Sequence, residues 1–234
     1  DCQDCYRVET LTADSGEQVL VAIAADGAGS AKHGQTGAEQ TCTVLAELVS
    51  AAIRLAPADL YTESRAREWL HRLRLHLDDL AREADRHVRD YATTLLMAIV
   101  GQQQSLFLQI GDGAMVTTIH GEQKVVFWPE SGLYANMTHF VTDEDVFEHM
   151  MIALQAGTIE ELAVFTDGLQ RLALQMDART AHAPFFEPIF AALRRLEAGA
   201  SAAMSQQLAL FLNSPQVNQR TDDDKTLIMA TRRR

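Results

Sequence analysis

The sequence predicts an α+β fold in which an antiparallel β core carries helices on its outer faces. Two observations support this prediction. The apolar spacing alternates between a helical period and short β-type runs, and turn residues separate most of the β-type runs. Along the chain the order is strands, two helices, many strands, two helices and one last strand. This segregation of strands and helices favours a layered α+β sandwich.

Length and composition predict one domain over residues 1–234. The chain has 47% hydrophobic and 22% charged residues, and we find no internal repeat or low-complexity linker. Its net charge of −12 argues against nucleic acid or an anionic membrane as the main partner. No apolar run approaches the roughly 20 residues that span a bilayer, and no signal peptide is visible. Three cysteines give no disulfide framework, so we expect a cytoplasmic protein.

The first third of the chain predicts two strands followed by two helices. A strand is expected at 8–12 and a turn at 13–16. Residues 19–25 are apolar without alternation, which is typical of a strand buried on both faces. Helical spacing follows at 36–53 and 64–89, the second with one apolar stripe and a charged back. Such helices lie on a core.

The pattern of apolar and turn residues in the rest of the chain predicts many strands in the middle and helices near the end. Turn residues such as Gly101 and Gly121 lie among the β-type runs, and we expect the first four runs to form a meander of adjacent antiparallel strands. The runs span 93–100, 105–110, 114–119, 124–128, 136–141, 150–154 and 162–165. Helices are predicted at 185–196 and 202–212, and a last strand at 226–231.

Four acids stand beside predicted strands. Asp26 and Asp167 each end a strand and precede glycine, Asp112 lies in Gly-Asp-Gly, and Asp223 precedes the last strand. If the strands share a sheet system, their ends bring these carboxylates to one rim. Clustered carboxylates raise one another's pKa unless a cation neutralises them, and oxygen-only ligands favour Mg²⁺ or Mn²⁺. The alternative is that the acids are only caps and turns of a structural domain.

These motifs and their order resemble the metal-dependent protein phosphatases of type 2C, the PPM family, and most closely a bacterial subgroup. The motifs are Asp-Gly-Ala-Gly at 26–29, Gly-Asp at 111–112, Thr-Asp-Gly at 166–168 and Asp-Asp-Lys-Thr at 223–226. Gln3-Asp4 looks like the Gln/Glu-Asp pair on the family's opening strand. The resemblance covers essentially the whole chain. It implies two antiparallel sheets flanked by helices, an αββα sandwich, with metals in a cleft at one end.

The resemblance also implies a role for each acid. Two Mn²⁺ or Mg²⁺ ions are expected, with a third, weaker one in bacterial members. Asp26 would bridge two ions, and Gly27 would offer its backbone carbonyl to one of them. Asp167 and Asp223 would hold the other. The remaining implied assignments are Asp4, which would orient metal-bound water, and Asp112, which would help the third ion.

The implied activity is hydrolysis of Ser/Thr phosphate on proteins by a water bridged between two divalent cations. Such a pair lowers the pKa of the water and neutralises the phosphoryl oxygens, so no covalent enzyme intermediate is needed. The implied partners are a phosphoprotein and a Ser/Thr kinase or its targets. The alternative is a non-catalytic relative that binds a phosphoprotein or another partner.

Several positions depart from the family pattern. Ala28 stands where many members have a histidine proposed to protonate the leaving group, and Asp224 replaces the asparagine of the last motif. The family's phosphate-binding Arg lies upstream of Gln3-Asp4, which leaves open whether the first strand is truncated. The short interval between Asp112 and Asp167 predicts a flap that is short or absent, with 129–142 remaining. His139 and His149, in or near predicted strands, are expected to pack or to face water.

Overall fold

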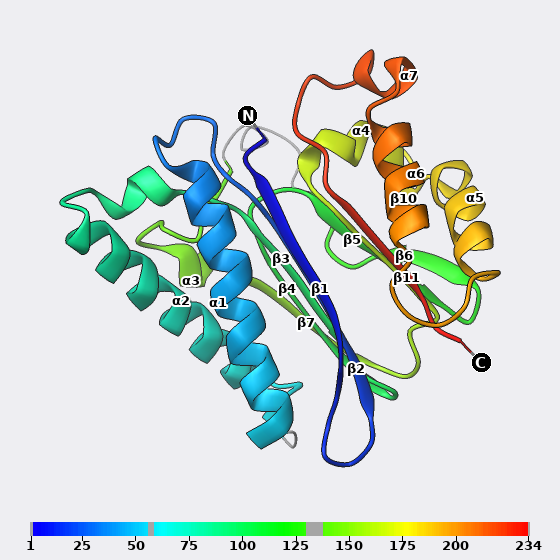
Figure 1. Ribbon diagram of the computed structural model, residues 1–234, viewed down its shortest axis with the longest axis horizontal. Coiled ribbons are helices and arrows are strands. Elements are labelled where there is room, and N and C mark those ends of the chain that lie inside the picture. Colours follow the sequence, from blue (N-terminus) through cyan, green and yellow to red (C-terminus); the bar gives the residue numbers. More distant parts are fainter. Residues whose placement is uncertain (1, 56–58, 130–137, 234) are drawn as a thin grey trace.

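The computed structural model describes residues 2–55, 59–129 and 138–233. Two antiparallel sheets lie against each other, with strand orders β1-β2-β3-β4-β7 and β11-β8-β5-β6 (Figure 1). The first sheet contains β1 (Asp4–Thr12), β2 (Gln18–Asp26), β3 (Leu95–Val100), β4 (Gln104–Ile110) and β7 (Met151–Ala156). The second contains β5 (Ala114–Ile119), β6 (Glu122–Val125), β8 (Glu161–Phe165) and β11 (Leu227–Thr231).

Helices cover the outer face of each sheet, which confirms the predicted αββα sandwich (Figure 1). Against the first sheet lie α1 (Gly34–Leu55) and α2 (Glu63–Glu83). The second sheet carries α5 (Ala183–Leu193) and α6 (Ala202–Leu212). The short elements are α3 (Val146–His149), α4 (Gln170–Ala173), α7 (Pro215–Asn218), a β9–β10 ribbon (Leu174–Gln175 and Thr180–Ala181) and 3₁₀ turns at Val88–Tyr91 and Asp167–Leu169. Among the described residues, no helix is both long and apolar enough to cross a membrane.

Strand β2 shows why its sequence lacks alternation. Val21 and Ile23 pack toward the helices, whereas Ala22 and Ala24 pack toward the second sheet. All four side chains are buried, because each face of the strand meets another layer. The small alanines lie between the sheets, and the larger side chains fill the space beneath α1 and α2.

The predicted meander is wrong. Strands β4 and β5 follow each other in sequence but belong to different sheets. The chain crosses between the sheets at Gly111-Asp112-Gly113, where both glycines have positive φ angles of 83° and 95°. Residues with a side chain rarely adopt these angles, so the glycines permit the crossing and place Asp112 at its centre.

The predicted end of the second helix and one predicted strand are also wrong. The second helix ends at Glu83, not at residue 89, because Asp85 adopts a left-handed φ of 53° and the helix cannot continue. The predicted strand at 136–141 is absent over its described part, where Val141 makes a single backbone bond to Thr93. Residues 136–137 of that prediction lie outside the described residues, as do residues 130–137 of the predicted flap remnant.

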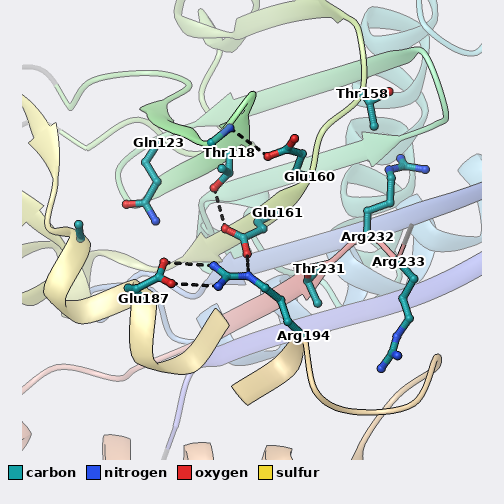
Figure 2. A pocket seen from close by; sticks show the side chains of 12 residues that line it. Thr118, Gln123, Thr158, Glu160, Glu161, Glu187, Arg194, Thr231, Arg232 and Arg233 are labelled. Carbon is teal, nitrogen blue, oxygen red and sulfur yellow. Dashed lines mark hydrogen bonds and ion pairs between the residues drawn. The ribbon is translucent and has the colours of Figure 1, made fainter. Parts of the chain in front are cut away.

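An ion pair between the buried Glu161 and the exposed Arg194 ties the end of α5 to the second sheet (Figure 2). Glu161 is only 6% exposed, accepts a 2.9 Å hydrogen bond from Thr118 on the neighbouring strand, and accepts another from Arg194 at 2.8 Å. Arg194 also makes two bonds to the exposed Glu187 and lowers the pKa of that carboxyl. These groups line an open cavity of about 790 Å³ together with Arg232 and other residues. Since Glu161, Arg194 and Glu187 are paired with one another, we interpret these three residues as a structural clamp.

We expect Arg194→Ala to destabilise the fold by about 2 kcal/mol, because it leaves the buried Glu161 carboxylate without its cation. Glu187→Gln is the matched control and should change the free energy of unfolding by less than about 0.5 kcal/mol, since that partner is exposed. Urea unfolding followed by circular dichroism measures both. Equal effects of the two variants would contradict the assignment of the clamp to Glu161.

Candidate metal centre

Strand register brings acidic residues of both sheets to the same end of the sandwich. In the first sheet, Asp4 at the start of β1 pairs with Asp26 at the end of β2. In the second sheet, Phe165 at the end of β8 pairs with both Ala114 and Leu227. The motif acids flank these three aligned positions: Asp167 follows β8, Asp112 precedes β5, and Asp223 and Asp224 precede β11. The predicted rim of carboxylates therefore exists.

Hydrogen bonds join the two halves of this rim. The Thr166 hydroxyl donates to Asp4 Oδ2 at 2.9 Å and accepts from the Thr226 amide at 3.0 Å. The Gln3 amide donates to Asp224 Oδ2 at 2.7 Å. The bonds from Thr166 to Asp4 and from the Gln3 backbone amide to Asp224 connect the N-terminal end of the first sheet to loops of the second, whereas the Thr226 bond lies within the second sheet. The position of Asp4 is thus set by both sheets, and Thr166 is a site residue that the sequence reasoning missed.

The backbone of Asp26 is held by two neighbouring threonines. Its amide donates to Thr94 Oγ1 at 3.0 Å, and its carbonyl accepts from Thr93 Oγ1 at 2.8 Å and from the Thr94 amide at 2.8 Å. These bonds satisfy the backbone where β2 ends. The carboxylate is left facing the other acids, whose charges act on it directly.

Three of these carboxylates, those of Asp4, Asp26 and Asp167, have raised pKa values. Burial, with the charges of Asp4, Asp167 and Asp223, raises the pKa of Asp26 to about 9. Burial, with the charges of Asp112 and Asp223, raises the pKa of Asp167 to about 6. Burial also raises the pKa of Asp4. The shared cause is that charged oxygens lie close together and away from water.

The residues present fit divalent cations. One oxygen each of Asp4 and Asp167 is buried without a hydrogen-bond partner in the described part of the chain. Within that part, no Lys or Arg forms an ion pair with the rim acids. Buried carboxylate oxygens without a partner are costly, and an oxygen-only donor set suits Mg²⁺ or Mn²⁺.

Close packing explains why a glycine, Gly168, follows Asp167. A Cβ atom on Gly168 would lie 2.0 Å from the carbonyl oxygen of Asp224. Any side chain there would push away the loop that carries Asp223 and Asp224. The glycine therefore lets the loop before β11 close onto the turn after β8.

Asp112 lies beside the cluster, and its charge acts on Asp167. Its Oδ2 accepts a 2.8 Å bond from the Thr138 hydroxyl, and the buried Gln109 amide donates to the carbonyls of Gly111 and Gly113. The crossing loop is thus held from both sides.

Ala28 and the nearby His33 show what the chain carries near the position of the family's histidine. Position 28 carries no ionisable group because it is an alanine. This residue is buried, and its amide donates to the Ala92 carbonyl. His33 lies with its ring centroid 5.4 Å from that of Tyr91 and its amide on the Asp90 carbonyl. No contact described here places His33 among the rim acids.

A family model described as protein phosphatase 2C matches residues 1–213. The chain belongs to the protein phosphatase 2C family. Among curated proteins, Serine/threonine-protein phosphatase 3 of Escherichia coli (strain K12) is 35% identical over 229 residues, covering 98% of this chain and 90% of that protein.

Solved structures support the protein phosphatase 2C fold. The Staphylococcus aureus serine/threonine phosphatase Stp1 has a TM-score of 0.65 at 14% identity, covering 100% of this chain and 90% of that one. The S. agalactiae serine/threonine phosphatase has a TM-score of 0.61 at 17% identity, covering 99% and 94%. RsbX in complex with magnesium has a TM-score of 0.54 at 15% identity, covering 98% and 86%. At these identities the likeness shows the fold.

We expect the metal-free protein to lose stability as the pH rises, through Asp26. Its pKa is about 9 in the folded state against an ordinary 3.8, so the folded form binds this proton more tightly. That contribution is complete below the lower pKa and is lost as the pH rises through the higher one. With chelator present, the free energy of unfolding should fall by several kcal/mol from about pH 5 to about pH 9, roughly 1.4 kcal/mol per pH unit between the two pKa values.

Urea unfolding at several pH values in chelator measures this fall. Asp26→Asn should flatten it, because the side chain no longer ionises, whereas Asp14→Asn in the exposed turn after β1 should keep the wild-type slope. The same slope in Asp26→Asn and in the wild type would contradict the explanation.

Proposed function

We propose that this protein is a metal-dependent phosphatase that hydrolyses phosphate esters of serine and threonine in proteins. The observation that supports it most is the meeting of Asp4, Asp26 and Asp167 with the loop before β11 at one end of both sheets. Membership of the protein phosphatase 2C family supports the same reaction. A phosphoprotein is the substrate that this class implies, and a Ser/Thr kinase is the expected opposing enzyme.

We assign the ligands as the resemblance to the family implies, and the rim supplies the acids. Asp26, Asp167 and Asp223, with the carbonyl of Gly27, would hold two Mn²⁺ or Mg²⁺ ions. Asp112 would contribute to a third. When bound, the ions supply a Lewis acid that lowers the pKa of water and neutralises charge on the phosphoryl oxygens.

The protein's own residues then position water. Asp4 is fixed through one carboxylate oxygen by Thr166, while its other oxygen is buried and free to accept a proton. It lies opposite Asp26 in the register, so it can orient a water at the centre of the acids. Thr166 holds Asp4 in place and does not itself need to touch the substrate.

The observation that favours a second candidate is Ala28. Because this position has no proton donor, a non-catalytic domain that binds a phosphoprotein is the alternative. The rim argues against it, since a domain without metals gains nothing from buried carboxylates that repel one another.

We expect Asp26→Asn and Asp167→Asn each to lower kcat/KM at least roughly 10³-fold, about 4 kcal/mol of transition-state stabilisation, because each variant removes a ligand. The assay is release of phosphate from a phosphoserine peptide in Mn²⁺, and Asp14→Asn should keep wild-type activity. Undiminished activity in both ligand variants would refute the assignment.

Calorimetry with Mn²⁺ separates the two candidates. We expect the wild type to bind Mn²⁺ and Asp26→Asn to bind it at least roughly tenfold more weakly, because the proposed bridging carboxylate is gone. Mn²⁺ binding together with phosphate release supports the phosphatase. Absence of Mn²⁺ binding in a folded wild type would favour the non-catalytic reading.

A further inference from the structure

A second group of metal-ligating side chains lies outside the carboxylate rim. His139, Asp145 and His149 each offer one ligand atom, and these three atoms lie within 4.8 Å of one another. The imidazole rings of His139 and His149 stack with centroids 3.5 Å apart and an angle of 11° between their planes. His149 Nε2 lies 3.1 Å from Asp145 Oδ2. We call these three residues the histidine cluster.

The backbone presents these side chains from a fixed frame. Asp145 and His149 are four residues apart, at the start and the end of α3, which places them on one side of that turn. The loop between His139 and α3 is anchored by Arg74 on α2, whose guanidinium donates to the carbonyls of Val141 and Asp143. The sequence reasoning treated both histidines as residues that pack or face water. Their contact with each other depends on this loop.

We propose that the histidine cluster binds one transition-metal ion of the Zn²⁺ class, through an imidazole nitrogen of His139 and of His149 and a carboxylate oxygen of Asp145. Two imidazoles and one carboxylate form a donor set suited to Zn²⁺, Co²⁺ or Ni²⁺, with water as a further ligand. Mg²⁺ prefers all-oxygen sites, so it competes poorly here. This site is separate from the phosphatase reaction and does not depend on it.

The surroundings suit an exchangeable ion. The side chains are 27%, 55% and 35% exposed for His139, Asp145 and His149, so an ion can enter directly from solvent. Between His149 and Asp145 the ion replaces the proton that now joins the two groups. On the far side, Asp143 Oδ2 lies 3.9 Å from His139 Nδ1. That separation exceeds a hydrogen bond, and the same oxygen accepts a 2.8 Å bond from the Phe140 amide, so Asp143 adds negative charge beside the ring.

The histidine cluster adjoins the loop that carries Asp112. The carbonyl oxygen of His139 packs so closely on Gly111 that a Cβ there would lie 2.7 Å away. The preceding residue, Thr138, donates to Asp112 Oδ2. An ion on the cluster therefore fixes a segment that touches one edge of the carboxylate rim.

The test uses the full chain with Asp26→Asn and excess Mg²⁺, which keeps Co²⁺ away from the rim. Co²⁺ is added and its visible absorption is followed, then Zn²⁺ is added to displace it. We expect one Co²⁺ per chain with the intense bands of a low-coordinate site. His139→Gln and His149→Gln should each weaken binding roughly tenfold or more. His71→Gln, an exposed histidine on α2, is the matched control and should bind as the parent does.

A second readout guards against misfolded variants. Zn²⁺ should raise the Tm of the parent and of His71→Gln but not of the cluster variants. Asp145→Asn keeps the side-chain volume at an exposed position and should also weaken Co²⁺ binding. The proposal is overturned if Co²⁺ does not bind the parent, or if folded cluster variants bind it as tightly as the parent does. In either case the stacked histidines are a packing contact only.

Discussion

Mutual repulsion among the rim carboxylates is the constraint that shapes this end of the sandwich. Asp26 and Asp167 would separate if their strands were free, yet strand pairing and the sheet-to-sheet bonds hold them together. The bond from Thr166 to Asp4 and the bond from the Gln3 amide to Asp224 cross between the sheets where the charges are densest. The hydrophobic layers away from the site contribute the folding free energy that offsets this repulsion.

The sequence was sufficient for the features that depend on neighbouring residues. The unbroken apolar run at 19–25 predicts a strand buried on both faces, and β2 has that environment. Asp26 and Asp167 could be placed at strand ends because each acid lies within two residues of the end of its apolar run. The αββα arrangement came from the resemblance of ordered motifs, since strand patterns alone do not say how many sheets the strands form.

Features that depend on distant contacts could not be read from the sequence. Whether β4 and β5 pair is decided by the crossing at Gly111 to Gly113, and a glycine-rich turn between two strands is equally typical of a hairpin. Thr166 looks like an ordinary strand-end residue until Asp4, far away in the sequence, is placed beside it. The Glu161–Arg194 pair likewise joins a strand to the end of a later helix, with no local pattern to mark it.

The chain between Asp112 and α3 joins the two candidate metal sites physically. Thr138 binds Asp112 on one side, while His139, the next residue, stacks on His149 on the other. Two adjacent residues therefore face two different donor sets, one of oxygen only and one rich in imidazole. Because the preferences of these sets differ, each site can select its own ion from a mixture. A displacement of His139 would still be transmitted to Asp112, through the peptide bond to Thr138 and the hydrogen bond from Thr138 to Asp112.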